Sequence, residues 1–153
     1  MSNTIKDKLR QYCRYQPRTH QDVRNKLYNG FNLRKCEVEA LLTDMIEEGL
    51  VSEEAFAIAF AHDRFKLNGW GSRKIAQTLK QRGISHYCIT IALSRIDKTN
   101  YEKHLQQLAA KKWASVKGNR FAKQQKATNY LLQKGYIIDE VKQALAELSN
   151  PNS

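Results

Sequence analysis

The sequence is rich in positively charged side chains, and their number and spacing indicate that the protein binds anions. The chain of 153 residues contains 26 Lys and Arg against 15 Asp and Glu, a formal net charge of +11. No acid occurs between Asp63 and Asp97, or between Glu102 and Asp139. Charged residues of an amphipathic helix lie opposite its apolar stripe, so these two intervals predict a basic surface. A basic surface that is merely solvated is the alternative.

Candidate contact residues for an anionic partner come from these two intervals. Each of them alone is also consistent with a solvated helix charge, and Arg64 with pairing to a carbonyl or carboxylate inside its own module. The candidates are Arg64, Lys66, Arg73, Lys74, Lys80, Arg82, Lys111, Lys112, Lys123 and Lys126. From Glu37 to Glu48 there are five acids and no Lys or Arg, so we expect a separate acidic surface there.

The residue types suited to catalysis or metal binding do not form a known catalytic or metal-binding motif in this sequence. His20, His62, His86 and His104 stand singly, and none belongs to an HExxH motif. The three cysteines are widely spaced without a CxxC pair, which argues against a zinc site or a disulfide framework and fits a reducing cytoplasm. Neither GxxxxGK[ST] nor GxGxxG occurs. We therefore expect a protein that is not an enzyme and uses no metal or other cofactor.

The basic intervals lie on predicted helices that occur in three similar copies. In the middle copy, residues 52–96, helical apolar spacing is interrupted at Gly69, Gly71 and Gly83, which predicts three short helices. Its apolar and glycine positions reappear 52 residues later. The pairs are Ile75 and Ala127, Leu79 and Leu131, Gly83 and Gly135, Ile89 and Val141, Ala92 and Ala144, Leu93 and Leu145, and Ile96 and Leu148. Val23 and Leu27 begin the same stripe in a first copy.

Three tandem three-helix modules are therefore predicted, at residues 1–51, 52–98 and 99–148, with a frayed tail at 149–153. The fold class is all-α, with helix-turn-helix-like repeats. A module of about 50 residues buries little apolar surface alone, so we expect neighbours to stack into an elongated, curved array. No apolar run approaches the length that spans a bilayer, and no export signal is evident, so we expect a cytoplasmic protein that does not enter a membrane.

Helix caps and aromatic residues complete the expectations for the fold. Thr19, Ser52 and Ser85 are predicted N-caps, because their hydroxyls can accept from the first unpaired amides. Trp70, between two glycines, is either exposed for recognition or folded back onto the core, and we favour core packing. The other aromatic residues at helical spacing are predicted to be core residues. They are Phe56, Phe60, Tyr101, Trp113 and Tyr130.

The segment EGLVSEEAFA at residues 48–57 and the residues after it resemble the signature of the RecX family of bacterial recombinase regulators. The matching residues that follow are Phe60, Arg64, Gly69, Gly71, Lys74, Ile75, Leu79, Arg82, Gly83 and Ile84. The sequence departs from the family pattern at Ser72, where proline is frequent, and at Ser52, where Asp or Asn is common. The resemblance implies three tandem repeats in a curved molecule that binds the RecA filament along its helical groove. It also implies lowered recombinase, ATPase and coprotease activities of RecA, with a role in DNA repair and the SOS response.

Two classes of function stay open at this point. The first is a regulator of the RecA filament, which we expect to act as a monomer, with single- or double-stranded DNA as an open second ligand. The second is a direct DNA- or RNA-binding module, because a three-helix unit with a basic second or third helix resembles helix-turn-helix architecture. A scaffold with neither activity is a third, weaker alternative.

Overall fold

The computed structural model describes residues 4–149, and in this range it contains α-helices and no strand. The helices are α1 (Ile5–Tyr15), α2 (His20–Gly30), α3 (Lys35–Glu47), α4 (Glu53–Asn68), α5 (Ser72–Gln81), α6 (His86–Ser94), α7 (Lys98–Ser115), α8 (Arg120–Lys134) and α9 (Ile138–Ser149). The predicted all-α fold is confirmed. Within the described range, no helix combines the length and apolar character needed to cross a membrane.

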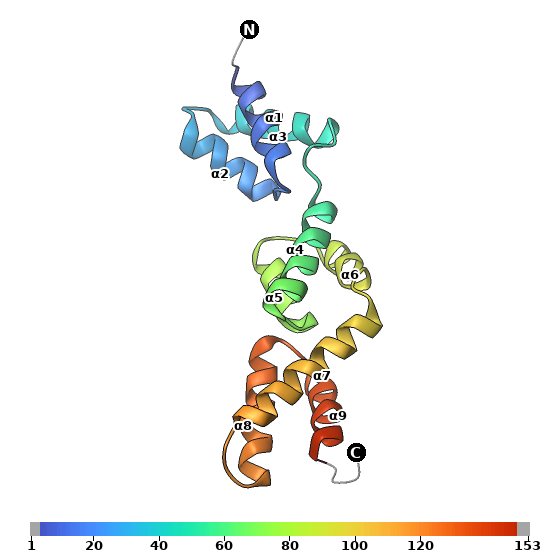
Figure 1. The fold of residues 1–153 in the computed structure, drawn as a ribbon. Helices are drawn as coiled ribbons and strands as arrows, with labels where there is room; N and C mark the ends of the chain where they lie inside the picture. Colours follow the sequence, from blue (N-terminus) through green and yellow to red (C-terminus); the bar gives the residue numbers. More distant parts are fainter. Residues whose placement is uncertain (1–3, 150–153) are drawn as a thin grey trace.

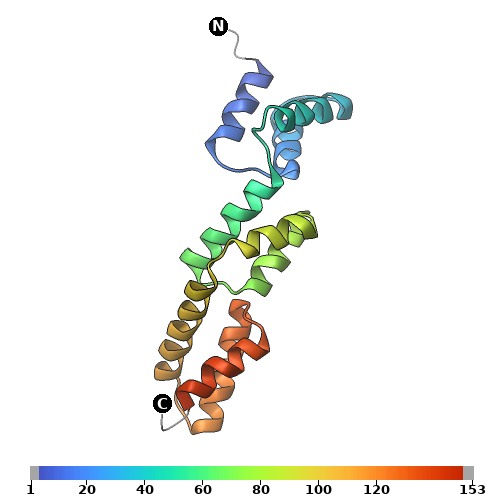
Figure 2. The same ribbon diagram turned by 90° about the vertical axis from the view of Figure 1, so that its right-hand side faces the viewer.

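The helices form three groups strung along one long axis, as Figures 1 and 2 show. We name them repeat 1 (α1–α3), repeat 2 (α4–α6) and repeat 3 (α7–α9). The elongated, curved array of three-helix repeats is confirmed. The module boundaries at 51/52 and 98/99 stay a prediction. The predicted tail at 149–153 lies outside the described residues except for Ser149, the last residue of α9.

Three helices begin directly after the N-cap residues that were predicted from the sequence. The hydroxyls of Thr19, Ser52 and Ser85 accept from backbone amides three residues later, at 2.9, 3.2 and 3.2 Å. Each bond satisfies an amide that has no partner within its helix, which stabilises the helix start. Gly83, after α5, has a φ of 82°, a conformation that glycine adopts without steric cost. These predictions are confirmed.

Buried apolar residues form two separate cores among the described residues. Repeat 1 has its own core, which includes Leu9, Leu27 and Met45. Repeats 2 and 3 share a single core, to which Leu79 and Leu131 contribute equivalent, fully buried side chains. The two later repeats are therefore one packing unit, and repeat 1 is another.

Backbone contacts join repeat 3 to repeat 2. The Gly71 amide donates to the Lys134 carbonyl at 2.7 Å, and the Arg73 amide donates to the Gly135 carbonyl at 2.9 Å. The buried Tyr136 hydroxyl donates to the Gly69 carbonyl at 3.1 Å. Direct backbone bonds leave little room for sliding, so the turn before α5 and the turn before α9 hold each other in register.

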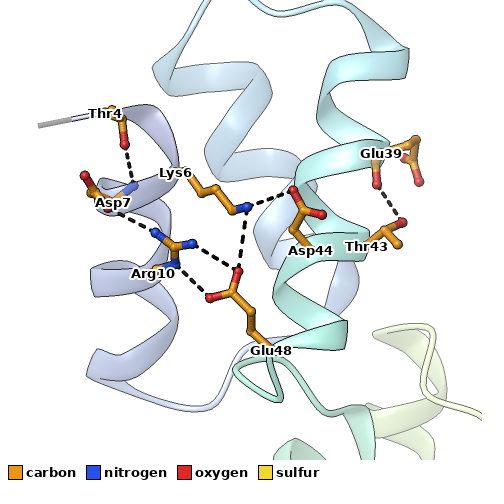
Figure 3. A network of polar contacts seen from close by, with 8 residues as sticks. All are labelled: Thr4, Lys6, Asp7, Arg10, Glu39, Thr43, Asp44 and Glu48. Carbon is orange, nitrogen blue, oxygen red and sulfur yellow. Dashed lines mark hydrogen bonds and ion pairs between the residues drawn. The ribbon is translucent and has the colours of Figure 1, made fainter. Parts of the chain in front are cut away.

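Ion pairs hold the helices of repeat 1 together, as Figure 3 shows for α1 and α3. The ammonium of Lys6 lies 3.3 Å from the carboxylate of Asp44. Arg10 donates to both carboxylate oxygens of Glu48, at 2.7 and 3.3 Å. A third acid of α3, Glu39, pairs in the same way with a basic residue of α2. Three of the five acids expected to form a separate acidic surface, Glu39, Asp44 and Glu48, are therefore paired with cations of neighbouring helices.

Candidate anion-binding surface

Helices α4 and α5 position three cations around an aromatic group in repeat 2. Phe56, Phe60 and Arg64 are four residues apart, so they form one stripe along α4. Lys74 and Arg82 are eight residues apart and form a stripe along α5 and its C-cap. The chain reverses at the glycines between the helices, so the end of α5 returns to the start of α4.

Each of these cations lies over a ring. The guanidinium of Arg82 is 5.2 Å from the centroid of Phe60, and that of Arg64 is 5.6 Å from the same centroid. The ammonium of Lys74 is 4.5 Å from the centroid of Trp70. Such contacts are worth about 0.5 to 1 kcal/mol at exposed sites. The rings therefore orient the cations without neutralising them, because a ring carries no net charge.

Trp70 packs onto the core, as favoured from the sequence. Its ring packs edge-on against Phe60, with centroids 6.2 Å apart, and it contacts the shared core. Core packing is thus confirmed, but Trp70 remains half-buried, with Lys74 above it. Phe60 is likewise only partly buried, whereas Phe56 is buried.

Arg64 has an unusual polar environment. Its Nε atom is buried and has no hydrogen-bond partner among the described residues. The pairing with a carbonyl or carboxylate that we considered for Arg64 is therefore not observed, and its guanidinium packs against aromatic rings instead. A buried donor without an acceptor carries a desolvation cost.

A second cation and aromatic group lies on repeat 3. The ammonium of Lys112 is 4.7 Å from the centroid of Tyr130, and that of Lys134 is 5.9 Å from the same centroid. Lys123 lies 4.7 Å from the centroid of Trp113. Both rings contact the core but are only partly buried, so the prediction that they are core residues is confirmed in part.

The two groups meet at the junction between the repeats. The ammonium of Lys134 donates to the carbonyl of Asn68, the last residue of α4, at 3.0 Å. Lys74 packs directly against Gly135. Figures 1 and 2 both show α5 and α8 on the same side of the molecule. We call the combined surface the cation–aromatic face; its members are Phe60, Arg64, Trp70, Lys74, Arg82, Lys112, Trp113, Lys123, Tyr130 and Lys134.

Five of the ten candidate residues belong to this face, and five do not. Those outside it are Lys66, Arg73, Lys80, Lys111 and Lys126. Lys66 follows Arg64 by two residues and so points away from it, because residues two apart on a helix do not share a face. Lys126 donates to the carbonyl of Lys117 at 2.9 Å. Lys134, which was not among the candidates, also belongs to this face, and the 52-residue offset relates it to Arg82.

No group of three or more His, Cys, Asp or Glu side chains that could hold a metal ion occurs in the described range. The fold and the surface define a class of protein, an α-helical tandem-repeat protein with a basic face. Models of the second and third three-helix domains of RecX match residues 52–93 and 100–145. The chain belongs to the RecX family.

Curated relatives carry the name Regulatory protein RecX. The one from Clostridium botulinum (strain Alaska E43 / Type E3) is 32% identical over 139 residues, which are 87% of this chain and 63% of the relative. The one from Halalkalibacterium halodurans is 29% identical over 141 residues, which are 90% of this chain and 52% of the relative. The chain thus spans between about half and two thirds of the length of these relatives.

Solved structures show the same fold. The crystal structure of RecX from Lactobacillus salivarius superposes with a TM-score of 0.82 at 21% identity, covering 94% of this chain and 93% of that one. A second crystal structure, of a regulatory protein RecX, superposes with a TM-score of 0.81 at 23% identity, covering 92% of this chain and 71% of that one.

Proposed function

We propose that this protein binds the RecA nucleoprotein filament through its cation–aromatic face and inhibits the recombinase, ATPase and coprotease activities of RecA. It acts as a cytoplasmic monomer without enzymatic activity of its own, and so tunes DNA repair and the SOS response. Membership of a family of regulatory proteins supports this proposal. The observation that carries it is the continuity of ring-oriented cations across repeats 2 and 3.

The shape of the molecule suits such a target. A nucleoprotein filament presents acidic groups at regular intervals over a long distance, and an elongated protein reaches several of them at once (Figure 2). The shared core and the backbone bonds between repeats 2 and 3 keep both halves of the face in a constant relationship. Because the two repeats are already fixed relative to each other, binding at the second repeat loses little further conformational entropy. The contacts of both repeats therefore contribute to affinity.

Direct duplex binding by a helix-turn-helix module is the weaker candidate. In that architecture a late helix enters the major groove, and it supplies the side chains that contact base edges. In repeat 2 the corresponding third helix, α6, has the sequence HYCITIALS, which contains no Lys or Arg. The cations belong to α4 and α5 instead, and they lie over rings.

The test compares two charge reversals on one helix. The K74E/R82E variant changes two members of the cation–aromatic face, and the R73E/K80E variant makes the same change of charge on α5 outside the face. We expect K74E/R82E to lose inhibition of RecA ATP hydrolysis on single-stranded DNA and to lose preference for RecA-coated over bare DNA. The R73E/K80E variant should retain most of both.

Circular dichroism of both variants checks that the fold is intact. Equal loss in the two variants would show that overall charge, and not this face, governs the effect, and full inhibition by K74E/R82E would remove the face from the proposal. Tight binding to bare duplex with a steep salt dependence, of log–log slope about 0.9 per phosphate contacted, would favour the helix-turn-helix candidate.

A further inference from the structure

The basic residues of repeat 1 fall into two sets with different partners. Lys6 and Arg10 are neutralised by acids of α3, as Figure 3 shows. Lys8, Arg18 and Lys26 instead lie over aromatic rings, and none of them is in an ion pair within the described residues. The acids Asp44 and Glu48 are already engaged by Lys6 and Arg10. Asp22 of α2 lies beside Tyr12 and Lys26, but its carboxylate caps α2 by accepting from the Thr19 amide and forms no ion pair with this second set.

The second set surrounds Tyr12. The guanidinium of Arg18 stacks 3.7 Å from the centroid of this ring, and its Nε atom donates to the Tyr12 carbonyl at 3.2 Å. The ammonium of Lys26 lies 5.3 Å from the same centroid. The hydrogen bond and the stacking together hold the guanidinium plane in place, and its outer face is turned away from the ring.

A shallow hollow opens around this stack, and its lining contains no acid. The lining residues are Lys8, Gln11, Tyr12, Tyr15, Arg18, Lys26 and Phe31. Tyr15 is three residues after Tyr12 on α1, so it lies on the same side of the helix. Its side chain is 82% exposed, so its ring is open to a ligand.

We propose that this hollow is a second binding site, which takes a segment of single-stranded nucleic acid. Lysine ammonium groups pair with phosphates, and unstacked bases stack on tyrosine rings and on arginine planes. A duplex keeps its base faces covered, and an acidic peptide has no bases to stack, so neither would use Tyr15. The site shares no residue with the cation–aromatic face, and it lies before residue 52, where the family-model matches begin.

The test uses the full chain carrying K74E/R82E, so that the other face contributes little. The probes are a fluorescent oligo-dT of about 12 nucleotides and an abasic deoxyribose-phosphate chain of the same length and charge. We expect tighter binding to oligo-dT than to the abasic chain or to an acidic peptide of equal charge. Y15A should weaken oligo-dT binding about 10-fold and leave abasic binding unchanged, because stacking alone is lost.

K26A should weaken binding of both chains and lower the salt slope by about 0.7, the value for one phosphate contact on a single strand. K35A, an equal change of charge on α3 outside the hollow, serves as the matched control and should leave binding unchanged. Ultraviolet cross-linking to iodo-deoxyuridine should label residues 5–31. Cross-links confined to residues 53–149, equal affinity for the abasic chain, or equal effects of K26A and K35A would overturn the proposal.

Discussion

Gly71 and Gly135 lie in direct backbone contact. A Cβ atom placed on Gly71 would fall 2.5 Å from the carbonyl carbon of Gly135, a separation that real Cβ atoms essentially never show. The two glycines are 64 residues apart in the chain and belong to different repeats. Their missing side chains allow the backbones of repeats 2 and 3 to bond to each other.

Gly71→Ala is expected to destabilise the protein by about 1 to 3 kcal/mol, the usual cost of inserting an atom into a close-packed site. Gly71 has a φ of −80°, so the cost comes from the clash with the Gly135 backbone and not from backbone strain. The matched control is Gly30→Ala, where a Cβ meets nothing within 4 Å. Urea unfolding followed by circular dichroism measures both; equal stability of the two variants would contradict the proposed close contact.

Leu27 and Leu131 occupy equivalent, fully buried positions in different cores. Replacing either with alanine should cost about 2 to 5 kcal/mol within its own core. Hydrogen exchange with mass spectrometry should show Leu27→Ala speeding exchange in α1–α3 alone, and Leu131→Ala speeding it in both repeat 2 and repeat 3. Faster exchange throughout the chain in the Leu27→Ala variant would mean that the cores are coupled.

Tyr136 should make the protein sensitive to alkali. Burial, followed by the neighbouring Tyr101, raises the pKa of the Tyr136 phenol above its ordinary value of 10. Above that pH the unfolded chain releases the proton while the folded chain keeps it, so stability is complete below pH 10 and falls as pH rises further.

Tyr136→Phe should remove that part of the alkaline loss. At neutral pH the same variant should lose about 1 to 3 kcal/mol, because the Gly69 carbonyl loses its buried donor. Unfolding midpoints from pH 7 to 11 measure both effects, with Tyr15→Phe, an exposed tyrosine, as the control. An unchanged pH profile for Tyr136→Phe would contradict this assignment.

Glu48 should titrate below its ordinary range. Its hydrogen bonds with Arg10 lower the pKa of the Glu48 carboxyl from 4.5. The stabilisation is complete above pH 4.5 and is lost as pH falls through the lowered pKa. Arg10→Gln should return the pKa of Glu48 toward 4.5, as measured by carbon-13 NMR of the side-chain carboxyl.

Arg24→Gln is the control for this titration. It should raise the pKa of Glu39, the partner of Arg24, and leave that of Glu48 unchanged. A Glu48 pKa that responds equally to both substitutions would show that general charge, and not the specific bidentate contact, controls the titration.

Periodicity predicted most of the fold, because helix stripes and caps are local features. The 52-residue offset between Leu79 and Leu131 identified the repeats, and the hydroxyl of Ser85 identified a helix start. The merging of two repeats into one core was not predictable in this way, since the three copies have similar apolar stripes. It depends on glycine contacts between turns that are distant in the chain.

The candidate surface was predicted only in part for the same reason. The acid-free intervals named Lys74 and Arg82, whose cations lie over rings, together with Lys66 and Lys80, which have no such contact in the described residues, because interval composition does not separate the faces of a helix. The stacking of Lys74 on Trp70 depends on how α5 returns beside α4. The neutralisation of Glu48 depends on α1 lying against α3, which the charge pattern of α3 alone does not contain.

The close contact between Gly71 and Gly135 sets the distance between the side chains of repeat 2 and those of repeat 3. Arg82 and Lys123 lie in different repeats of one shared core, so this contact helps to set the separation between them. In the proposed complex, a partner that engages both residues would have to offer negative groups at that same interval, so spacing as well as charge would select it.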